Sequence, residues 1–202
     1  MKRESNIYGV CLNIINYLDK TKDEPATKAK LANLRNSITK DISYNIESLA
    51  FVFSMIPEDY LGTYKELNYF EDTILTVLQL YAIYQQGKDE SVVYRNDEFP
   101  YISFGKSLSS LRQIPKDKNT NDNNAIDQRF NAMVTSADIE ELKHHLRQMI
   151  KLLKSKSKET IDFASLSKDL YDFRFGDKEP VRIKWSRDYY RYSAHKKGDK
   201  DE

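Results

Sequence analysis

The sequence predicts an all-α protein, and three observations favour this fold class. The chain of 202 residues holds only 6 glycines and 5 prolines, which leaves few tight turns and favours long helices. Apolar residues recur at intervals of three and four along most of the chain, as they do on one face of a helix. No segment shows a convincing strand pattern. We therefore expect eight or nine helices.

The first half of the chain contains the longest predicted helix. Helical spacing of apolar residues predicts helices over residues 7–18, 27–38, 46–56 and 64–84. Pro57 ends the third of these helices, and Gly87 is a natural stop for the fourth. The fourth helix carries a broad apolar stripe that includes Leu67 and Tyr81, so we expect it to be packed in a core.

The second half begins with a long connection. Residues 88–104 show no helical period and include Pro100. Beyond them, helices are predicted over residues 106–114, 125–134, 138–153, 161–173 and 179–192. We expect Ser136 to cap the helix at 138–153, because Glu140 and Glu141 follow where the helix dipole favours acids.

A polar run separates two parts of the chain. Residues 115–124 contain no apolar residue except Pro115, so they are the best candidate for a loop or linker. We therefore predict an N-terminal helical part over 1–114 and a C-terminal helical part over 125–202 that ends in a charged tail.

Composition excludes several classes of protein. An apolar fraction of 40% and an aromatic fraction of 12% are too high for a disordered chain. No stretch approaches 18 uninterrupted apolar residues, and the mean hydropathy is -0.70, so a membrane-spanning protein is excluded. The 32 basic and 31 acidic residues give a net charge of +1, which excludes a chain that is basic all over.

The only cysteine is Cys11, so no intramolecular disulfide can form, and we interpret this side chain as a small core residue. The segment 7–18 contains Asn13 and Asn16 and lacks a small-residue cleavage site. It reads as an amphipathic helix and not as a signal peptide, so we expect a cytoplasmic protein.

The most distinctive charge pattern covers residues 142–158, which hold six basic residues and no acid. Five of the six fall within roughly 80° of arc on a helix. These five are Lys143, Arg147, Lys151, Lys154 and Lys158. The pattern has two interpretations: a positive ridge that contacts the phosphates of a strand, or a solvated lysine face balanced by acids on a neighbouring helix. For an isolated stripe, the second interpretation is the more common.

A second basic pattern lies near the end of the chain, at Lys184, Arg187 and Arg191. Aromatic residues lie between these cations, and aromatics beside arginine can stack nucleic-acid bases. Trp185 and Tyr189 are four residues apart, however, and we interpret them as core residues.

Nothing in the sequence indicates an enzyme, a metal or a cofactor. Residues 105–107 (Gly-Lys-Ser) look like the end of a phosphate-binding loop, but the loop requires glycine where this chain has Pro100. His144 and His145 are adjacent and point to different helix faces, so they cannot chelate one metal from one side. No pair of carboxylates is singled out for acid–base chemistry.

Several segments, in this order, resemble CasB, the small subunit of the type I-E CRISPR Cascade complex. The segments are residues 31–35 (Leu-Ala-Asn-Leu-Arg), 104–108 (Phe-Gly-Lys-Ser-Leu), 128–133 (Gln-Arg-Phe-Asn-Ala-Met), 140–142, 145–149, 161–164, 168–170 and 185–190 (Trp-Ser-Arg-Asp-Tyr-Tyr). Each motif is weak alone, but the ordered set spans roughly residues 27–192.

The resemblance implies two small helical bundles in a non-catalytic subunit. It also implies these partners: the other Cascade subunits, a second copy of the chain, crRNA, and target DNA through its target or displaced strand. No membrane or small-molecule substrate is implied. The positions that match basic sites of the family are Arg35, Lys106, Arg129 and Arg147. The ridge itself adds Lys143, Lys151 and Lys154 as further nucleic-acid-binding candidates.

We therefore expect a subunit that binds nucleic-acid backbone without sequence specificity and stabilises the crRNA–target R-loop in antiviral defence. The near-zero net charge permits this role, because residues 125–202 hold 17 basic and 14 acidic residues, whereas residues 1–124 hold 15 and 17. The alternative is a helical module that binds only proteins. A small helical enzyme has almost no support.

Overall fold

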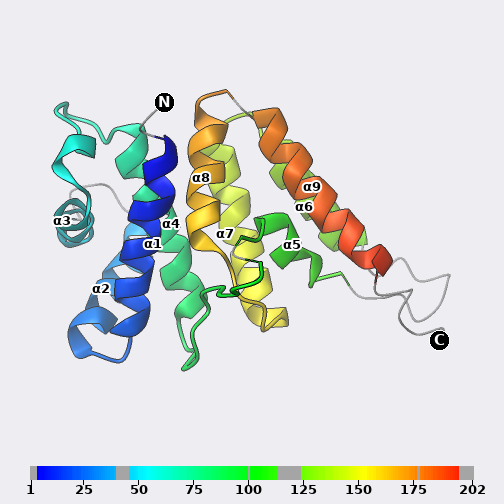
Figure 1. Cartoon of the computed structure of the whole chain (residues 1–202), viewed down its shortest axis with the longest axis horizontal. Helices are drawn as coiled ribbons and strands as arrows, with labels where there is room; N and C mark the ends of the chain where they lie inside the picture. Colours follow the sequence, from blue (N-terminus) through cyan, green and yellow to red (C-terminus); the bar gives the residue numbers. More distant parts are fainter. Residues whose placement is uncertain (1–3, 40–45, 100, 113–123, 177, 196–202) are drawn as a thin grey trace. The chain divides into compact units, whose positions relative to one another are not determined.

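The computed structural model describes residues 4–39, 46–99, 101–112, 124–176 and 178–195, and within these ranges the chain forms nine α-helices and no β-strand. The all-α prediction is therefore confirmed (Figure 1). The helices are α1 (Glu4–Lys20), α2 (Pro25–Asn36), α3 (Ile46–Met55), α4 (Tyr69–Gln85), α5 (Phe104–Ser109), α6 (Asn124–Val134), α7 (Ile139–Lys156), α8 (Phe163–Arg174) and α9 (Lys178–His195). Two short 3-10 helices, η1 (Ser37–Thr39) and η3 (Glu58–Tyr60), complete the described elements.

The chain divides into two compact units, and the division differs from the predicted one. The first unit comprises Met1–Val93 and Phe163–Tyr171, and the second comprises Tyr94–Asp162 and Asp172–Glu202. Residues 94–112, which we assigned to the N-terminal part, belong to the second unit because α5 packs on α9. Most of the predicted linker at 115–124 lies outside the described residues, so its role as a linker stays a prediction.

The first unit is built around α4, which packs against α1, α2 and α3. Nearly every α4 side chain from Phe70 onward is buried, polar ones included. Gln79 satisfies its buried amide by donating to Ser37 Oγ at 2.8 Å. The beginning of α8 joins this core through Phe163, whose ring meets Tyr81 edge-on at a centroid distance of 5.3 Å. Both rings are almost fully buried, so they fix the packing of α8 on α4.

The second unit has an aromatic core in which α9 is the central partner. Trp185 packs edge-on against Phe104 of α5, and Tyr189 stacks on Phe130 of α6 with centroids 3.7 Å apart. Gly105 explains the closeness of α5 and α9, because a Cβ at this position would lie 2.1 Å from the Trp185 carbonyl oxygen. The predicted core role of Trp185 and Tyr189 is confirmed, since both are fully buried.

The predicted starts of two helices and the predicted cap of a third were wrong, and capping side chains explain all three differences. The helix predicted at 64–84 starts at Tyr69, because Asn68 forms a capping box with Glu71. The short helix predicted at 106–114 covers Phe104–Ser109 instead, with Ser103 as its N-cap.

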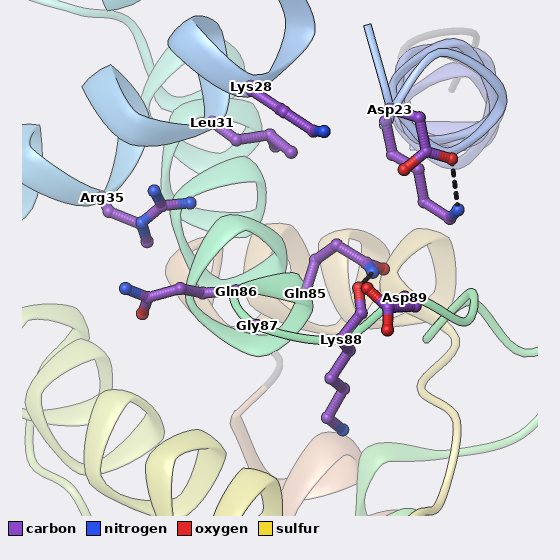
Figure 2. Close-up of a pocket in the computed structure, with 10 residues that line it drawn as sticks. Asp23, Lys28, Leu31, Arg35, Gln85, Gln86, Gly87, Lys88 and Asp89 are labelled. Atoms are coloured by element: carbon purple, nitrogen blue, oxygen red, sulfur yellow. Dashed lines mark hydrogen bonds and ion pairs between the residues drawn. The ribbon is translucent and has the colours of Figure 1, made fainter. Parts of the chain in front are cut away.

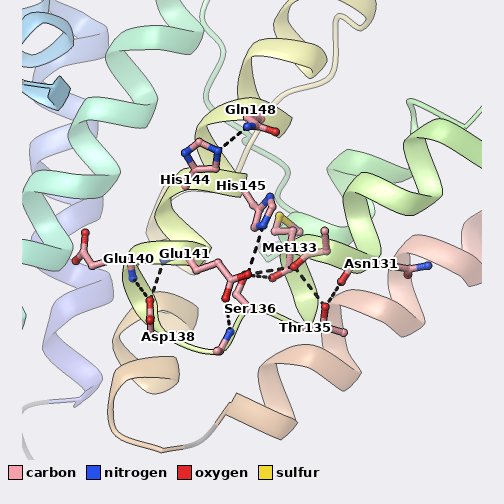
Figure 3. Close-up of polar contacts among 12 residues, drawn as sticks. Asn131, Met133, Thr135, Ser136, Asp138, Glu140, Glu141, His144, His145 and Gln148 are labelled. Carbon is pink, nitrogen blue, oxygen red and sulfur yellow. Dashed lines mark hydrogen bonds and ion pairs between the residues drawn. The ribbon is translucent and has the colours of Figure 1, made fainter.

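The start of α7 is the third case (Figure 3). Asp138 caps this helix, and its Oδ1 accepts hydrogen bonds from the backbone N–H groups of Glu140 and Glu141 at 2.9 Å each. Ser136, the predicted cap, instead donates from Oγ to the Met133 carbonyl at 2.8 Å and so satisfies the end of α6.

Candidate nucleic-acid interface

The basic residues of α7 are held in a fixed direction by the opposite side of the helix. Leu142, Leu146, Ile150 and Leu153 are fully buried and anchor α7 to the core of the second unit. The predicted basic arc lies beside this buried face, as helix geometry requires. We call the α7 residues Lys143, Arg147, Lys151 and Lys154 the α7 ridge.

The first member of the α7 ridge is neutralised within the chain. Lys143 is only 7% exposed, and its Nζ forms an ion pair with Glu140 Oε1 at 2.9 Å. The same carboxylate oxygen lies 4.0 Å from Arg174 of α8. Lys143 therefore contributes little exposed charge, and the interpretation of a lysine face balanced by an acid holds at this one position.

The rest of the α7 ridge is accessible to different degrees. Lys151 is exposed, whereas Arg147 and Lys154 are half-buried. Burial lowers the pKa of the Arg147 guanidinium, and the nearby Glu140 carboxylate opposes this shift. An arginine starts from so high a pKa that Arg147 stays charged at neutral pH. A half-buried arginine is well suited to hold a phosphate oxygen, because its guanidinium is weakly hydrated and presents several donors in a planar array.

Arg35 lies in the first unit, in a pocket of about 290 Å³ between α2 and the turn that follows α4 (Figure 2). Its guanidinium is half-buried, and Nη1 donates one long hydrogen bond of 3.5 Å to the Ala82 carbonyl. Burial lowers its pKa, and no carboxylate in the described part of the chain pairs with it. Arg35 therefore keeps most of its five donors available for an anion.

Other cations line the same pocket. Lys28 extends from α2 toward the same space as Arg35, whereas the Lys88 side chain points the other way (Figure 2). Lys88 Nζ lies 3.7 Å from the centroid of the Tyr84 ring, which holds it by a cation–π contact. Lys22 is paired with Asp23 at 2.9 Å. The cation that the pocket offers beside Arg35 is thus Lys28, which sequence reasoning missed because helix α2 and the α4 turn meet only in the folded chain.

Lys106 and Arg129 lie on two other helices of the second unit, and both side chains are exposed. Lys106 is on α5, where the flanking Gly105 and Ser107 are buried. The Gly-Lys-Ser segment is therefore a packing motif that leaves one lysine outside. Arg129 is on the exposed side of α6, two residues after Asp127, which is engaged by Arg112.

The structure brings together only part of the predicted set. Arg147, Lys151 and Lys154 share one side of α7 with Glu140, and Figure 3 shows Glu140 and His145 pointing to different sides of that helix. Lys106 and Arg129 come from other helices, and Arg35 belongs to the other unit. Glu140 is the functional neighbour that the sequence analysis overlooked. Its position three residues before Lys143 was the available signal.

A protein-family model decides the identity of the chain. The model described as CRISPR-associated protein Cse2 matches residues 30–190, about four-fifths of the sequence. The chain belongs to the CRISPR-associated protein Cse2 family. The predicted kinship with CasB is thereby confirmed. The Cse2 family is a non-catalytic subunit family of the Cascade complex in CRISPR defence, so the prediction that the chain is not an enzyme is also confirmed.

Solved structures show the same fold for Cse2 relatives. CasB from Thermobifida fusca matches with a TM-score of 0.68 and 20% identity, over 91% of this chain and 97% of that one. CasB from M. ruber matches with a TM-score of 0.64 and 20% identity, over 92% and 97%. A comparison with curated proteins gives no match.

Cys11, His144 and His145 have partners within the described part of this Cse2 chain. Cys11 is buried, and its Sγ donates to the Phe163 carbonyl at 3.6 Å. His145 lies 3.8 Å from Glu141, and His144 is bonded to Gln148. Across the described ranges, no group of three or more His, Cys, Asp or Glu side chains is placed to hold a metal ion. Nor does any helix described there have the length and apolar character needed to cross a membrane.

Proposed function

We propose that this Cse2 chain binds the phosphate backbone of nucleic acid within Cascade, without sequence specificity, and thereby stabilises the crRNA–target R-loop. The observation that carries the proposal is the α7 ridge. There Arg147, Lys151 and Lys154 lie on one side of a rigid helix, and the 17 residues from 142 to 158 contain no acid. The chemistry offered is a row of cations without a base-reading pocket, which suits phosphates and not sequence.

The energetics of R-loops explain why such a row is useful. The RNA–DNA duplex that forms is about as stable as the DNA duplex that it replaces, so the exchange is nearly balanced. Each phosphate neutralised on a single strand releases counterions, which favours the bound state most strongly at low salt. A few backbone contacts are therefore enough to shift the balance toward the open R-loop.

The partners in this proposal are the other Cascade subunits, a second copy of the chain, crRNA and target DNA, through its target or displaced strand. The proposal assigns exposed backbone contacts to Lys151, Lys106 and Arg129. Arg147, Lys154 and Arg35 would make half-buried contacts, whereas Lys143 would make none because it is buried and paired with Glu140. Support for Arg35 comes from its pocket, where a phosphate would supply the acceptors that the single bond to Ala82 does not.

A charge reversal tests the α7 ridge. Cascade carrying Arg147→Glu and Lys151→Glu should form a shorter-lived R-loop on its target, because two phosphate contacts are replaced by repulsion. The matched control is Lys20→Glu with Lys65→Glu, two exposed lysines of the first unit that lie outside the α7 ridge and the Arg35 pocket. R-loop lifetime, followed as strand separation in a labelled duplex, is the measurement.

The R-loop lifetime distinguishes the proposed function from its alternative. A shortened lifetime in the α7 variant, with the control unchanged and both chains folded by circular dichroism, supports the proposal. An unchanged lifetime across low and high salt would remove the α7 ridge from the nucleic-acid interface and favour the alternative, a helical module that binds only proteins.

A further inference from the structure

A second positive surface lies on α9, away from the residues already assigned. We call it the α9 face and define it by five exposed residues: Ile183, Lys184, Arg187, Tyr190 and Arg191. At about 100° per residue they fall within about 120° of arc. That arc contains three cations and no acid.

The direction of the α9 face is fixed by the buried side of the helix. Val181, Trp185 and Tyr189 are at most 4% exposed and occupy the opposite arc. Tyr189 donates from its hydroxyl to Asp127 at 2.7 Å, and Tyr190 donates to Asn131 at 2.8 Å. These contacts hold α9 in one rotation about its axis, so the exposed arc is a permanent feature of the second unit.

The cations of α9 divide into two sets. Lys178 and Arg182 serve the fold: Lys178 Nζ donates to the Ala137 carbonyl and Arg182 Nη2 to the Ser136 carbonyl, each at 2.7 Å. Arg187 and Arg191 have no such role, since no described carboxylate or carbonyl engages them. Two exposed arginines that make no fold-stabilising contact are therefore candidates to bind an external anion.

The two acids of α9, Glu179 and Asp188, lie outside the arc of the α9 face and make contacts within the fold. Glu179 is paired with Arg182 at 2.5 Å. Asp188 accepts a hydrogen bond from the Ser103 hydroxyl, also at 2.5 Å, and is half-buried. The case for an external anion therefore depends mainly on Arg187 and Arg191.

We propose that the α9 face binds the phosphate backbone of a single nucleic-acid strand, as a contact separate from the α7 ridge. From Lys184 to Arg191 the helix rises about 10 Å, a length over which one strand of a duplex carries about three phosphates. The surface is a convex helix face and not a pocket, so it matches an extended polyanion. This contact goes beyond the proposed function, because it adds a second binding surface to the subunit.

The test removes the three cations in the assembled complex. Cascade carrying Lys184→Gln, Arg187→Gln and Arg191→Gln is compared with a control that loses the same charge elsewhere, at Lys20→Gln, Lys65→Gln and Lys168→Gln. Affinity for a labelled single-stranded target is measured as a function of salt. The α9 variant should lower the slope of log affinity against log salt by about 2 for each copy of the chain that contacts the strand.

The salt slopes of the α9 variant and its control show whether the α9 face contacts nucleic acid. A loss of slope in the α9 variant alone supports this contact. A slope equal to that of the control overturns it, and so does failure of the folded α9 variant to enter Cascade, which would identify the α9 face as a contact for an acidic protein surface. The α7 variant in the same assay separates this contact from the proposed function. A lower slope for the α7 variant with an unchanged slope for the α9 variant removes only the α9 contact.

Discussion

The α7 ridge and the α9 face differ in a way that the number of cations does not reveal. The α7 ridge has four positive residues, but Lys143 is buried against Glu140, and Arg147 and Lys154 are half-buried. The α9 face has three positive residues, and all three are exposed. Although the sequence of α7 is more basic than that of α9, the α7 ridge does not present more accessible cations than the α9 face.

The difference arises from what each helix must do for the fold. Glu140 of α7 pairs with Lys143 on the same helix and also lies near Arg174 of α8, so Lys143 belongs to a charge cluster at the contact between α7 and the end of α8. On α9 the fold-stabilising contacts are made by Lys178 and Arg182 in the first turns, which donate to the carbonyls of Ala137 and Ser136. A cation that makes no contact within the fold is thus a better candidate to bind an external ligand than a cation identified only by its place in a basic stretch of sequence.

The largest change in stability is expected from removing Trp185, which anchors α9 in the core of the second unit. Trp185→Ala should lower the free energy of unfolding by about 3–5 kcal/mol, because a fully buried indole is replaced by a cavity beside Phe104. Urea unfolding measures the change. Ile183→Ala is the control on the same helix, and its 52% exposure predicts a change within about 0.5 kcal/mol. A loss below 1 kcal/mol for Trp185→Ala would mean that the α9 face has no fixed orientation.

The second prediction concerns alkaline pH and the contact between α6 and α9. Burial raises the pKa of the Tyr189 hydroxyl, and its hydrogen bond to Asp127 adds to this. The folded chain therefore keeps a proton that the unfolded chain loses above its ordinary pKa of about 10. The stability from this group is complete below that pH and falls above it, by up to about 1.4 kcal/mol per pH unit.

Tyr189→Phe isolates this effect, because it keeps the stacking on Phe130 and removes only the ionisable group. The unfolding free energy of the variant should fall less steeply between pH 10 and 11 than that of the unchanged chain. Equal slopes for the two chains would show that Tyr189 is not protected from ionisation and that the contact between α6 and α9 is looser than described.

The smallest change is expected from removing the Glu140 carboxylate of α7. Glu140→Gln removes the carboxylate that neutralises Lys143, so the α7 ridge gains one positive charge. We expect the salt slope of DNA binding by Cascade to steepen by up to about 0.7, with a stability loss of about 1 kcal/mol from the lost ion pairs. Glu179→Gln on α9 is the matched control, since it breaks an ion pair with Arg182, away from the α9 face. A slope that does not change would mean that Lys143 stays out of reach of the strand even when unpaired.

The helices were predictable because their apolar stripes are local, whereas their ends were not. Where a helix starts depends on which polar side chain reaches the free backbone N–H groups, and Asn68 and Asp138 do so in place of the residues predicted. The boundary between the units was also beyond sequence reasoning, because Gly105 of α5 meets Trp185 across 80 residues of chain.

In the candidate site, the positions of residues along one helix were predictable, whereas contacts between helices were not. Helix periodicity placed Arg147, Lys151 and Lys154 on one arc, and the structure keeps them there. The burial of Lys143 and the approach of Arg174 to Glu140 arise only in the folded chain. The pocket around Arg35 likewise combines α2 with the turn after α4, and no local pattern could join them.

Nucleic-acid binding by the α7 ridge is tested by the salt dependence of target binding by Cascade with and without the cations of this ridge. Arg147→Gln, Lys151→Gln and Lys154→Gln are introduced together, and affinity for the target is measured across a salt series. Backbone contact predicts that the slope falls by about 2 for each copy of the chain that contacts single-stranded nucleic acid. A slope identical to that of the unchanged complex, with the variant folded and assembled, would contradict nucleic-acid binding by the α7 ridge.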